Sequence, residues 1–461
     1  MSQCTNKTSQ NHTVILGGGL SGLATGFMLS AAGKKVSVLE SGNNVGGLSQ
    51  TVSHNGFLFD LGGHRFLTKK KELEQFVLAL LKDDVLDVPR KSKIYMRRKY
   101  FDYPLKPLNA TFGLGLGITC EILWDYFAQR VNNFFHDKEL VSLEDWVVHR
   151  FGRKMFDLYF KEYTEKVWGL ECDQISMEWV AQRIDGLSLG KAIKNAFFKF
   201  SGRDIPTLTD RFYYPLLGIG EISDRMKESI EIINSVETKT RVTKIRHADN
   251  TIQSVVAVNS HTYEQHGSEF VSSIPLTSLV KMLDPGPPQE IIDACNQLKF
   301  RDLVIVTLML NRERITDLTW MYLPEKDIPL GRIHEPKNWS PHMSPKGKTS
   351  IVAEYFCFAG DKIWGATDEE LRDITAENLI QLNFIRKEDV LDFCVIRAKN
   401  AYPIFEIGYQ AHYEKILDYL STFSNLHLVG RGGKFKYYNM DHALESGIET
   451  ARNILKNAPI Q

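Results

Sequence analysis

Three glycines near the N-terminus have the spacing of a phosphate-binding turn. Gly17, Gly19 and Gly22 follow a short apolar run at residues 14–16 and precede a stretch of helical periodicity at residues 20–29. The first glycine permits a tight turn, the second lets the backbone approach a pyrophosphate, and the third lets helix and strand pack closely. The amino end of the helix then offers free N–H groups and a positive dipole end to the phosphates.

An acid stands where a nucleotide ribose needs a hydrogen-bond acceptor. A second apolar run at residues 35–39 ends at Glu40, about 20 residues after the glycines, and such an acid binds a ribose hydroxyl. The glycines alone are also compatible with an ordinary tight turn. The complete strand–turn–helix–strand–acid unit predicts a dinucleotide site.

Further glycines favour FAD over NAD. Ser41 opens a segment that brings Gly46 and Gly47 directly after the acid, which is typical of FAD-binding folds. Residues 426–433 again run from a strand pattern into a glycine turn, and residues 441–454 then read as a helix with Asn439 or Asp441 as its N-cap. FAD is therefore expected between segments from both ends of the chain.

Composition limits the class of partner. Lys+Arg and Asp+Glu are equal at 56 each, so there is no global field to attract nucleic acid. No segment reaches the roughly 20 apolar residues of a membrane span. The nearest, residues 112–124, is read as a buried or surface helix and is where peripheral contact with a membrane would occur.

The cysteines and the N-terminus predict a cytoplasmic protein. The cysteines are scattered and form no C-x-x-C pair, which predicts reduced thiols and no metal site. Residues 1–12 are polar and lack the apolar core of a signal peptide, so we expect a flexible arm.

The strand and helix patterns predict an α/β fold with a discontinuous FAD-binding, Rossmann-like domain of the GR2 type. That domain is assigned residues 13–68, 221–285 and 422–458, a mostly helical insertion takes residues 69–220, and an antiparallel-sheet substrate domain takes residues 286–421. Within the insertion, residues 92–100 predict a hairpin around Arg97, Arg98 and Lys99. This basic triplet is read as a solvated turn in preference to a phosphate site.

Several segments resemble the UDP-galactopyranose mutases, a group within the amine oxidase and protoporphyrinogen oxidase superfamily. Residues 163–169 (YTEKVWG) and 430–440 (GRGGKFKYYNM) resemble two specific mutase segments. Residues 62–66, 210–220 and 332–337 are similar to three others, in the same order along nearly the whole chain. The glycine motifs are shared more widely, with phytoene desaturases among others.

The resemblance implies a non-redox use of flavin. A mutase of this kind interconverts pyranose and furanose forms of a nucleotide-activated sugar through an adduct between the sugar and N5 of reduced FAD, in the assembly of cell-surface glycans. NAD(P)H is a candidate reductant, the partner is a small-molecule nucleotide sugar, and a homodimer is suggested.

The resemblance to the mutases implies roles for individual residues of this chain. Catalytic roles fall on His64, Arg332 and Tyr437, and substrate binding falls on Trp168, Tyr214, Arg332 and Tyr437. The expected FAD-binding residues are Gly17, Gly19, Leu20, Ser21, Gly22, Glu40, Ser41, Gly47, Leu48, Gly63, His64, Val242, Gly430, Arg431, Asn439 and Met440.

Each assignment has a structural alternative. Arg332 also reads as a surface arginine, His64 as a hydrogen-bonded core histidine, and Tyr437 as a core aromatic. Trp168 is equally compatible with packing and with stacking on a ligand. Glu165 and Lys166 are interpreted as an ion pair within a helix.

One departure opens a second hypothesis. The mutases place a diphosphate-binding arginine directly after YTEKxWG, where this chain has Leu170, and Asn439 replaces an aspartate. The alternative is an FAD-dependent oxidoreductase with an aromatic pocket, for which the candidates are Phe101, Tyr103, Tyr213, Tyr214 and Tyr355. A flavoprotein with structural FAD that binds a partner is a third hypothesis.

Overall fold

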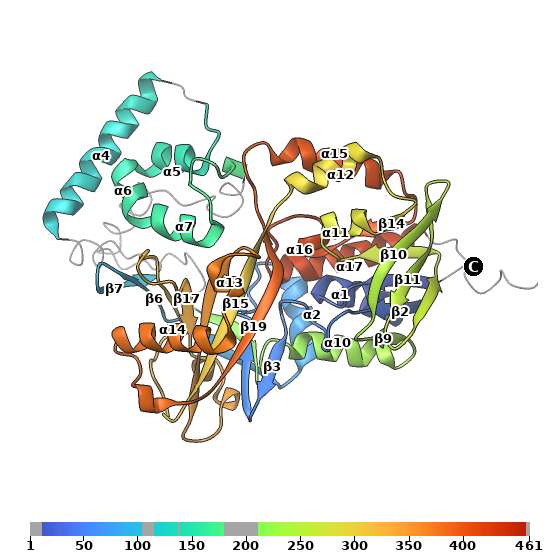
Figure 1. The fold of residues 1–461 in the computed structure, drawn as a ribbon, viewed down its shortest axis with the longest axis horizontal. Coiled ribbons are helices and arrows are strands. Elements are labelled where there is room, and N and C mark those ends of the chain that lie inside the picture. Colours follow the sequence, from blue (N-terminus) through green and yellow to red (C-terminus); the bar gives the residue numbers. More distant parts are fainter. Residues whose placement is uncertain (1–11, 104–114, 137–138, 179–210, 458–461) are drawn as a thin grey trace, which may run out of the picture.

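A parallel sheet forms the centre of the nucleotide-binding half of the molecule (Figure 1). The computed structural model describes residues 12–103, 115–136, 139–178 and 211–457. The five strands lie in the order β20-β13-β1-β2-β9 and come from the three segments that were predicted to form the FAD domain. Their bounds are β1 His12–Leu16, β2 Lys35–Leu39, β9 Ser235–Glu237, β13 Glu269–Ser272 and β20 Leu426–Leu428. The predicted α/β fold class is confirmed.

Helix α1 (Leu20–Ala31) packs between α10 (Glu221–Glu231) and α17 (Met440–Asn457). The approach of α1 to α17 is so close that a Cβ on Gly447 would lie 2.2 Å from the carbonyl oxygen of Ser21. A Cβ on Gly22 would likewise lie 2.1 Å from the carbonyl oxygen of Gly17. Gly447 thus lets the C-terminal helix pack on α1, and Gly22 lets α1 pack on its own glycine turn.

A seven-stranded, largely antiparallel sheet forms the other half, in the order β19-β15-β18-β17-β16-β6-β7. Its central strands β15 and β18 are completely buried, with α14 (Asp368–Gln381) packed beside β15 and β19. The bounds are β6 Ser92–Met96, β7 Lys99–Tyr103, β15 Phe300–Leu310, β16 Trp320–Tyr322, β17 Arg332–His334, β18 Thr349–Cys357 and β19 Val390–Pro403.

The predicted hairpin exists, but its place in the helical insertion is wrong. Strands β6 and β7 pair through a turn at Arg97 and Arg98, and β6 then joins β16 in parallel, so the hairpin extends the substrate-domain sheet. Sequence periodicity identifies a strand but carries no information about which distant strand it pairs with. Arg97 and Arg98 are exposed, which agrees with the solvated-turn interpretation.

Smaller sheets and helices complete the fold. The order β12-β11-β10-β14 forms one sheet beside the nucleotide-binding half, and β3-β4 and β5-β8 are two-stranded. The strand bounds are β3 Thr51–His54, β4 Phe57–Asp60, β5 Val85–Pro89, β8 Arg211–Pro215, β10 Arg241–Ala248, β11 Thr251–Val258, β12 Thr262–His266 and β14 Leu283–Asp284. The helix bounds are α2 Lys71–Leu81, α11 Leu276–Lys281, α12 Gln289–Gln297, α13 Lys362–Gly365, α15 Tyr409–Ser421 and α16 Gly430–Gly433.

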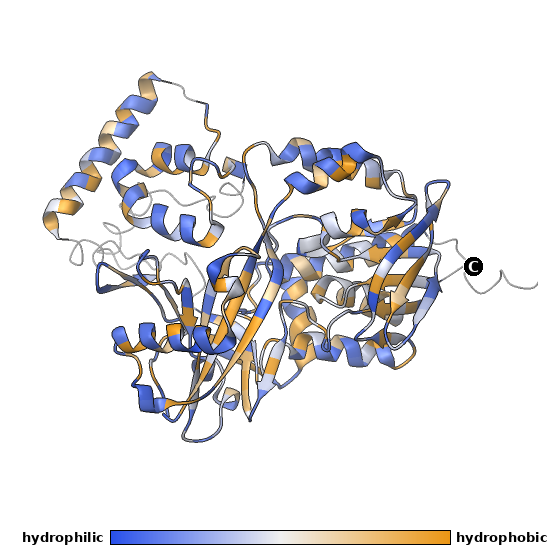
Figure 2. Ribbon diagram, in the orientation of Figure 1, coloured by the Kyte–Doolittle hydropathy of each residue, from blue (hydrophilic) through white to orange (hydrophobic). Residues whose placement is uncertain are grey.

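The helical insertion stands at the margin of the molecule (Figures 1 and 2). It contains α4 (Leu116–Phe135), α5 (Leu143–Phe151), α6 (Arg153–Tyr159) and α7 (Lys161–Trp168). Helix α4 turns apolar side chains outward, with 43% to 84% of each exposed: Leu116, Leu123, Trp124, Phe127, Val131, Phe134 and Phe135. Among the described residues no helix is both long and apolar enough to cross a bilayer. Peripheral contact through α4 stays a prediction.

Two sequence-based boundaries change. His12, assigned to the arm, begins β1, and its buried Nε2 lies 2.9 Å from the hydroxyl of Ser37. The helix expected at residues 112–124 begins at Leu116 and continues to Phe135, while residues 112–114 lie outside the described part, as do residues 1–11.

A buried carboxylate joins three separate segments. Asp60 on β4 accepts hydrogen bonds from Thr51 Oγ1 (2.6 Å), Tyr214 Oη (2.6 Å) and the backbone N–H of Ile219 (3.2 Å). Although these donors favour the charged form, burial outweighs them and raises the pKa of Asp60 to about 7.

This site predicts a pH-dependent stability. The folded protein keeps the Asp60 proton up to about pH 7, whereas the unfolded chain releases it near the ordinary pKa of 3.8. The contribution to the free energy of unfolding therefore falls as the pH rises through that interval, by up to about 1.4 kcal/mol per unit. Urea unfolding across this range should show that decline relative to Asp60→Asn. The exposed carboxylate variant Asp87→Asn is the control, and an Asp60→Asn profile parallel to wild type would contradict the prediction.

Candidate functional site

The amino end of α1 is shaped to receive phosphates. Its first residues have no side-chain cap, and a Cβ built on Gly19 meets no atom within 4 Å. The exposed end of a helix and an open glycine backbone together form an anion site. Gly17 has φ +101°, a conformation that glycine adopts without strain, and this turns the chain from β1 into the helix.

Glu40 is fixed beside this turn. Its Oε2 accepts the N–H of Gly18 at 2.8 Å, and its Oε1 accepts the N–H of Gly42 at 2.6 Å. Each carboxylate oxygen keeps a further lone pair, so the carboxylate can also accept from a ribose hydroxyl. The N–H of Gly46 donates to the carbonyl of Gly18 at 2.8 Å. This hydrogen bond holds Gly46 and Gly47 against the glycine turn at residues 17–19.

A second group of residues surrounds three buried nitrogen atoms that have no hydrogen-bond partner in the described part of the chain: His64 Nδ1, Trp320 Nε1 and Arg332 Nε. They lie close together, since a Cβ on Gly63 would touch the Trp320 ring and the Arg332 guanidinium lies 5.4 Å from that ring. Burial, together with Arg431 and Arg332, lowers the pKa of His64 to about 3, so its imidazole is neutral near pH 7. Buried donors without partners mark a place where a polar ligand belongs.

An aromatic group adjoins these nitrogens. The rings of Tyr402 and Tyr437 stack at 17° with centroids 5.9 Å apart, and Trp168 meets both edge-on at 6.3 and 5.9 Å. The Arg431 guanidinium lies 5.0 Å from the Tyr402 ring and 5.4 Å from the Tyr437 ring. It is held there by the carbonyls of Tyr438 and Ala401.

Arg332 is linked to a carboxylate and to this aromatic group. Its Nη2 forms an ion pair with Glu354 and donates to Tyr402 Oη at 3.2 Å. Burial opposes the charge of Arg332, but Glu354 and the surrounding tyrosines hold its pKa well above the ordinary value. Glu354 Oε1 also accepts the N–H of Gly63 at 3.2 Å, so one carboxylate contacts both Arg332 and the glycine loop.

The YTEKVWG segment is anchored through its lysine. Lys166 Nζ donates to the carbonyls of residues 323, 325, 328 and 330 within 2.5–3.3 Å, and burial lowers its pKa to about 8. Glu165 pairs instead with Lys326 at 3.2 Å, so the predicted Glu165–Lys166 ion pair is wrong. Adjacent residues on a helix do not face each other.

Arg301 and Gly169 complete this anchor. The buried Arg301 donates to the carbonyls of Lys166, Val167 and Phe356, which ties α7 to β15 and β18. Gly169 has φ +65°, and a Cβ there would lie 2.4 Å from Arg301 Nη1. The segment therefore delivers Trp168 to the aromatic group.

A family model for flavin-containing amine oxidoreductases matches residues 20–455. The chain belongs to this family. Coproporphyrinogen III oxidase of Bacillus subtilis is 22% identical over 91% of this chain and 93% of its own length. Protoporphyrinogen oxidase 2 of Arabidopsis thaliana is 20% identical over 88% and 87%. The crystal structure of reduced UDP-galactopyranose mutase superposes with a TM-score of 0.83 at 21% identity, over 98% of this chain and 95% of that one.

The predicted cofactor and the predicted superfamily are therefore confirmed: this amine oxidoreductase family member is an FAD-dependent enzyme. Its residues fit the group. The uncapped end of α1 would hold the pyrophosphate, Glu40 the ribose, and the buried nitrogens around His64 the polar edge of the ring system. Gly430, with φ +75°, brings the C-terminal segment within reach, since a Cβ there would lie 2.6 Å from Ser21 Oγ.

Most predicted site residues lie in these two groups, but Tyr214 does not. Its ring is 1% exposed against Trp339, and its hydroxyl donates to Asp60, so the predicted contact with substrate is wrong. Phe101 and Tyr355 are also core residues, with Tyr355 Oη bonded to Thr375. An apolar ring next to a strand pattern does not reveal whether it faces a core or a ligand.

The roles of all these site residues stay predictions, and the other predicted cofactor residues differ in exposure. Leu20, Ser21, Val242 and Met440 are buried, Leu48 and Gly63 are partly buried, and Ser41, Gly47 and Asn439 are exposed. Leu170 packs against the apolar core beside Trp168, so no cation stands there.

Sequence reasoning missed Tyr402 and Glu354. A signal for Glu354 exists, because it is the only charged residue in the apolar run 351–358, and a charge in a buried strand needs a partner. Tyr402 carries no comparable signal.

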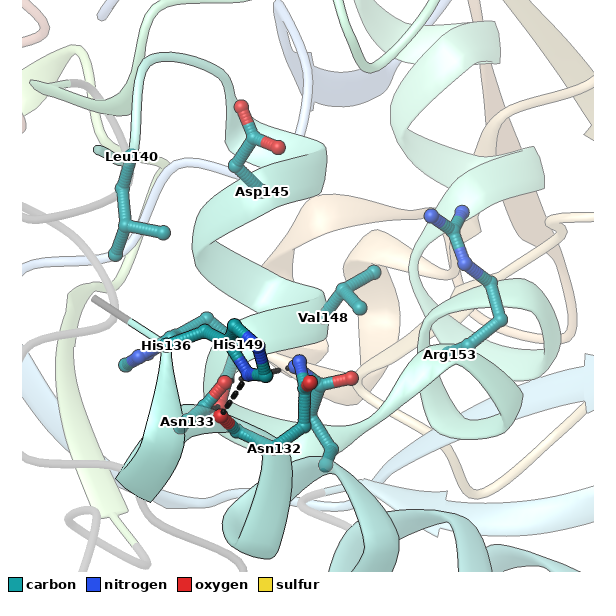
Figure 3. A pocket seen from close by; sticks show the side chains of 9 residues that line it. Asn132, Asn133, His136, Leu140, Asp145, Val148, His149 and Arg153 are labelled. Carbon is teal, nitrogen blue, oxygen red and sulfur yellow. Dashed lines mark hydrogen bonds between the residues drawn. The ribbon is translucent and has the colours of Figure 1, made fainter. Parts of the chain in front are cut away.

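A polar cavity of about 290 Å³ lies elsewhere, between α4, α5 and α6 (Figure 3). It is lined by Gln129, Asn132, Asn133, His136, Leu140, Asp145, Val148, His149 and Arg153. Its charged residues already have partners: Asp145 caps α5 through Ser142, and Arg153 pairs with Glu144. None of the residues predicted to be catalytic, His64, Arg332 and Tyr437, lines it.

Removing the ribose acceptor should weaken FAD binding. We expect Glu40→Ala to raise the Kd for FAD about 10- to 100-fold, the value of hydrogen bonds to a charged group. Equilibrium dialysis of the apoprotein with FAD measures this. Glu237→Ala is the control, since Glu237 ends the neighbouring strand and its carboxylate contacts Tyr263. Equal affinities for the two variants would contradict the assignment.

Removing the Lys166 ammonium should destabilise the fold. Lys166→Met leaves four carbonyls without their donor, and we expect the free energy of unfolding to fall by about 2–3 kcal/mol. Lys326→Met, which removes an exposed ion pair with Glu165, should cost less than about 1 kcal/mol. Urea denaturation of both variants gives the comparison, and similar losses would argue against a special role for Lys166.

Proposed function

We propose that this enzyme is an FAD-dependent oxidoreductase whose substrate presents an uncharged, flat portion to the aromatic group of Trp168, Tyr402 and Tyr437. The observation that carries the proposal is the pairing of Arg332 with the buried Glu354, which cancels the charge of a predicted diphosphate-binding arginine. The mutases have a second diphosphate-binding arginine directly after YTEKxWG, and this chain has Leu170 at that position. A diphosphate carries about two negative charges, and a site that holds it needs uncompensated cations.

Three other cations of this region contact groups of the protein itself. Arg301 and Lys166 donate to backbone carbonyls, as described above, and Arg431 is held by two carbonyls with its charge beside the tyrosine rings. The walls are aromatic, and such walls favour flat apolar groups. The relatives named coproporphyrinogen III oxidase and protoporphyrinogen oxidase, each similar over most of the chain, support this reaction class.

When bound, the flavin would accept a hydride from the substrate or donate one to it. The residues of the chain orient the substrate and control protons. Tyr402 Oη accepts from Arg332, which leaves its own O–H to donate to the substrate. His64 is neutral near pH 7, so it can hydrogen-bond through Nδ1 without adding charge. In the oxidative direction the substrate would lose a hydride from a C–H bond and one proton. The hydride would go to the cofactor, the proton to solvent or a basic group, and dioxygen or another acceptor would reoxidise the cofactor.

A flavin-dependent mutase for a nucleotide-linked sugar is the second candidate. The high structural similarity to UDP-galactopyranose mutase favours it, as does the location of Arg332 and Tyr437 in one site. A mutase uses reduced flavin and consumes no net oxidant. The two candidates therefore predict different results in the same experiment.

An anaerobic comparison tests the two candidates. Oxidised holoenzyme is mixed with a panel of porphyrinogens and amines, and dithionite-reduced holoenzyme is mixed with UDP-, dTDP- and GDP-sugars. We expect a substrate of the first panel to bleach the yellow flavin, and no isomeric nucleotide sugar by HPLC from the second. An isomer that forms only with reduced enzyme would replace our proposal by the mutase.

A further inference from the structure

Glu354 is a buried acid to which neither predicted reaction assigns a chemical step. It lies within β18, a strand whose residues are all buried, and it is itself 1% exposed. A carboxylate in such a place is retained only if cations and N–H donors replace its hydration. Its partners are Arg332 on β17 and the backbone N–H of Gly63.

Both partners belong to the functional site. Gly63 precedes His64, and Gly62 must lack a side chain because its Cβ would lie 3.1 Å from the Glu354 carboxyl carbon, with a φ of +106°. Arg332 in turn holds Tyr402 Oη and lies 4.9 Å from the Phe356 ring. Glu354 thus fixes the glycine loop on one side and the arginine–tyrosine pair on the other.

We propose that Glu354 is a positioning and specificity-determining residue: it holds Arg332 against Tyr402 and cancels its charge, so that the site rejects diphosphate-bearing ligands. This inference deepens the proposed function and rests on it for the substrate class. It assigns the preference for an uncharged substrate portion to one carboxylate, in addition to the absence of an arginine at Leu170.

The test measures ligand binding, so it does not depend on turnover. Purified holoenzyme is titrated with UDP and, separately, with inorganic pyrophosphate, and the flavin spectrum reports binding. In Glu354→Gln the shape is kept and the negative charge is removed, so Arg332 should bind these probes at least about tenfold more tightly than in wild type. The flavin midpoint potential should also become more positive, a change that a merely structural side chain would not cause.

Two variants control for indirect effects. Glu335→Gln removes another buried carboxylate nearby, one that accepts from the N–H groups of Ile315 and Thr316 and from Thr349 and Asn338, and that pairs with no arginine among the described residues. It should leave probe affinity unchanged. The double variant Glu354→Gln/Arg332→Met should lose the gain, because the freed cation is gone.

A second single variant keeps the proposal testable if Glu354→Gln does not fold. Arg332→Met leaves Glu354 unpaired, so the flavin midpoint potential should become more negative and sulfite should bind the flavin more weakly. Wild-type affinity for UDP that equals that of Glu354→Gln, or potentials unchanged in both single variants, would overturn the inference. A gain in UDP affinity without redox turnover of any substrate would instead uphold the role of Glu354 and refute the proposed oxidoreductase.

Discussion

A charge that is removed from water must regain its hydration from the protein, and the region around the flavin site is built to meet that demand. Arg301, Arg332, Lys166 and Glu354 are placed where α7, β15, β17 and β18 meet, and each is surrounded by carbonyls, N–H groups or an opposite charge. Because these partners come from separate segments, satisfying the charges also fixes how the helical insertion sits on the seven-stranded sheet. The same arrangement determines what electrostatic environment a substrate meets.

The cofactor half of this structure was predictable because its determinants are local. A phosphate cradle depends on glycines within a few residues of one another and on an acid one βαβ unit away, so spacing alone carries the information. Strands such as β2 and β20 were also identifiable, since each is a short apolar run between turn residues. The family resemblance added the order of the segments and placed His64, Arg431 and Tyr437 near one another.

The substrate half was predicted less well because its determinants are pairings across long stretches of sequence. Lys166 finds its acceptors about 160 residues away, and Tyr214 finds Asp60 across 154 residues. The type of residue was visible in each case, but the partner was not. The hairpin β6–β7 was predicted, but its place in the seven-stranded sheet was not, since periodicity gives a strand and only the folded sheet gives its neighbour. For the same reason, the sequence was sufficient to assign the cofactor, whereas the proposed substrate class depends on charge pairs seen only in the structure.

The close contact of α1 with α17 has a consequence for biosynthesis. The helix that would hold the phosphates is synthesised well before β20 and α17, which complete the sheet and cover that helix. At the usual rate of about 5–20 residues per second, the nascent N-terminal unit waits for tens of seconds with an apolar face uncovered. A complete site for the flavin therefore exists only after α17 has been synthesised, and until then the chain exposes apolar surface that the folded protein buries.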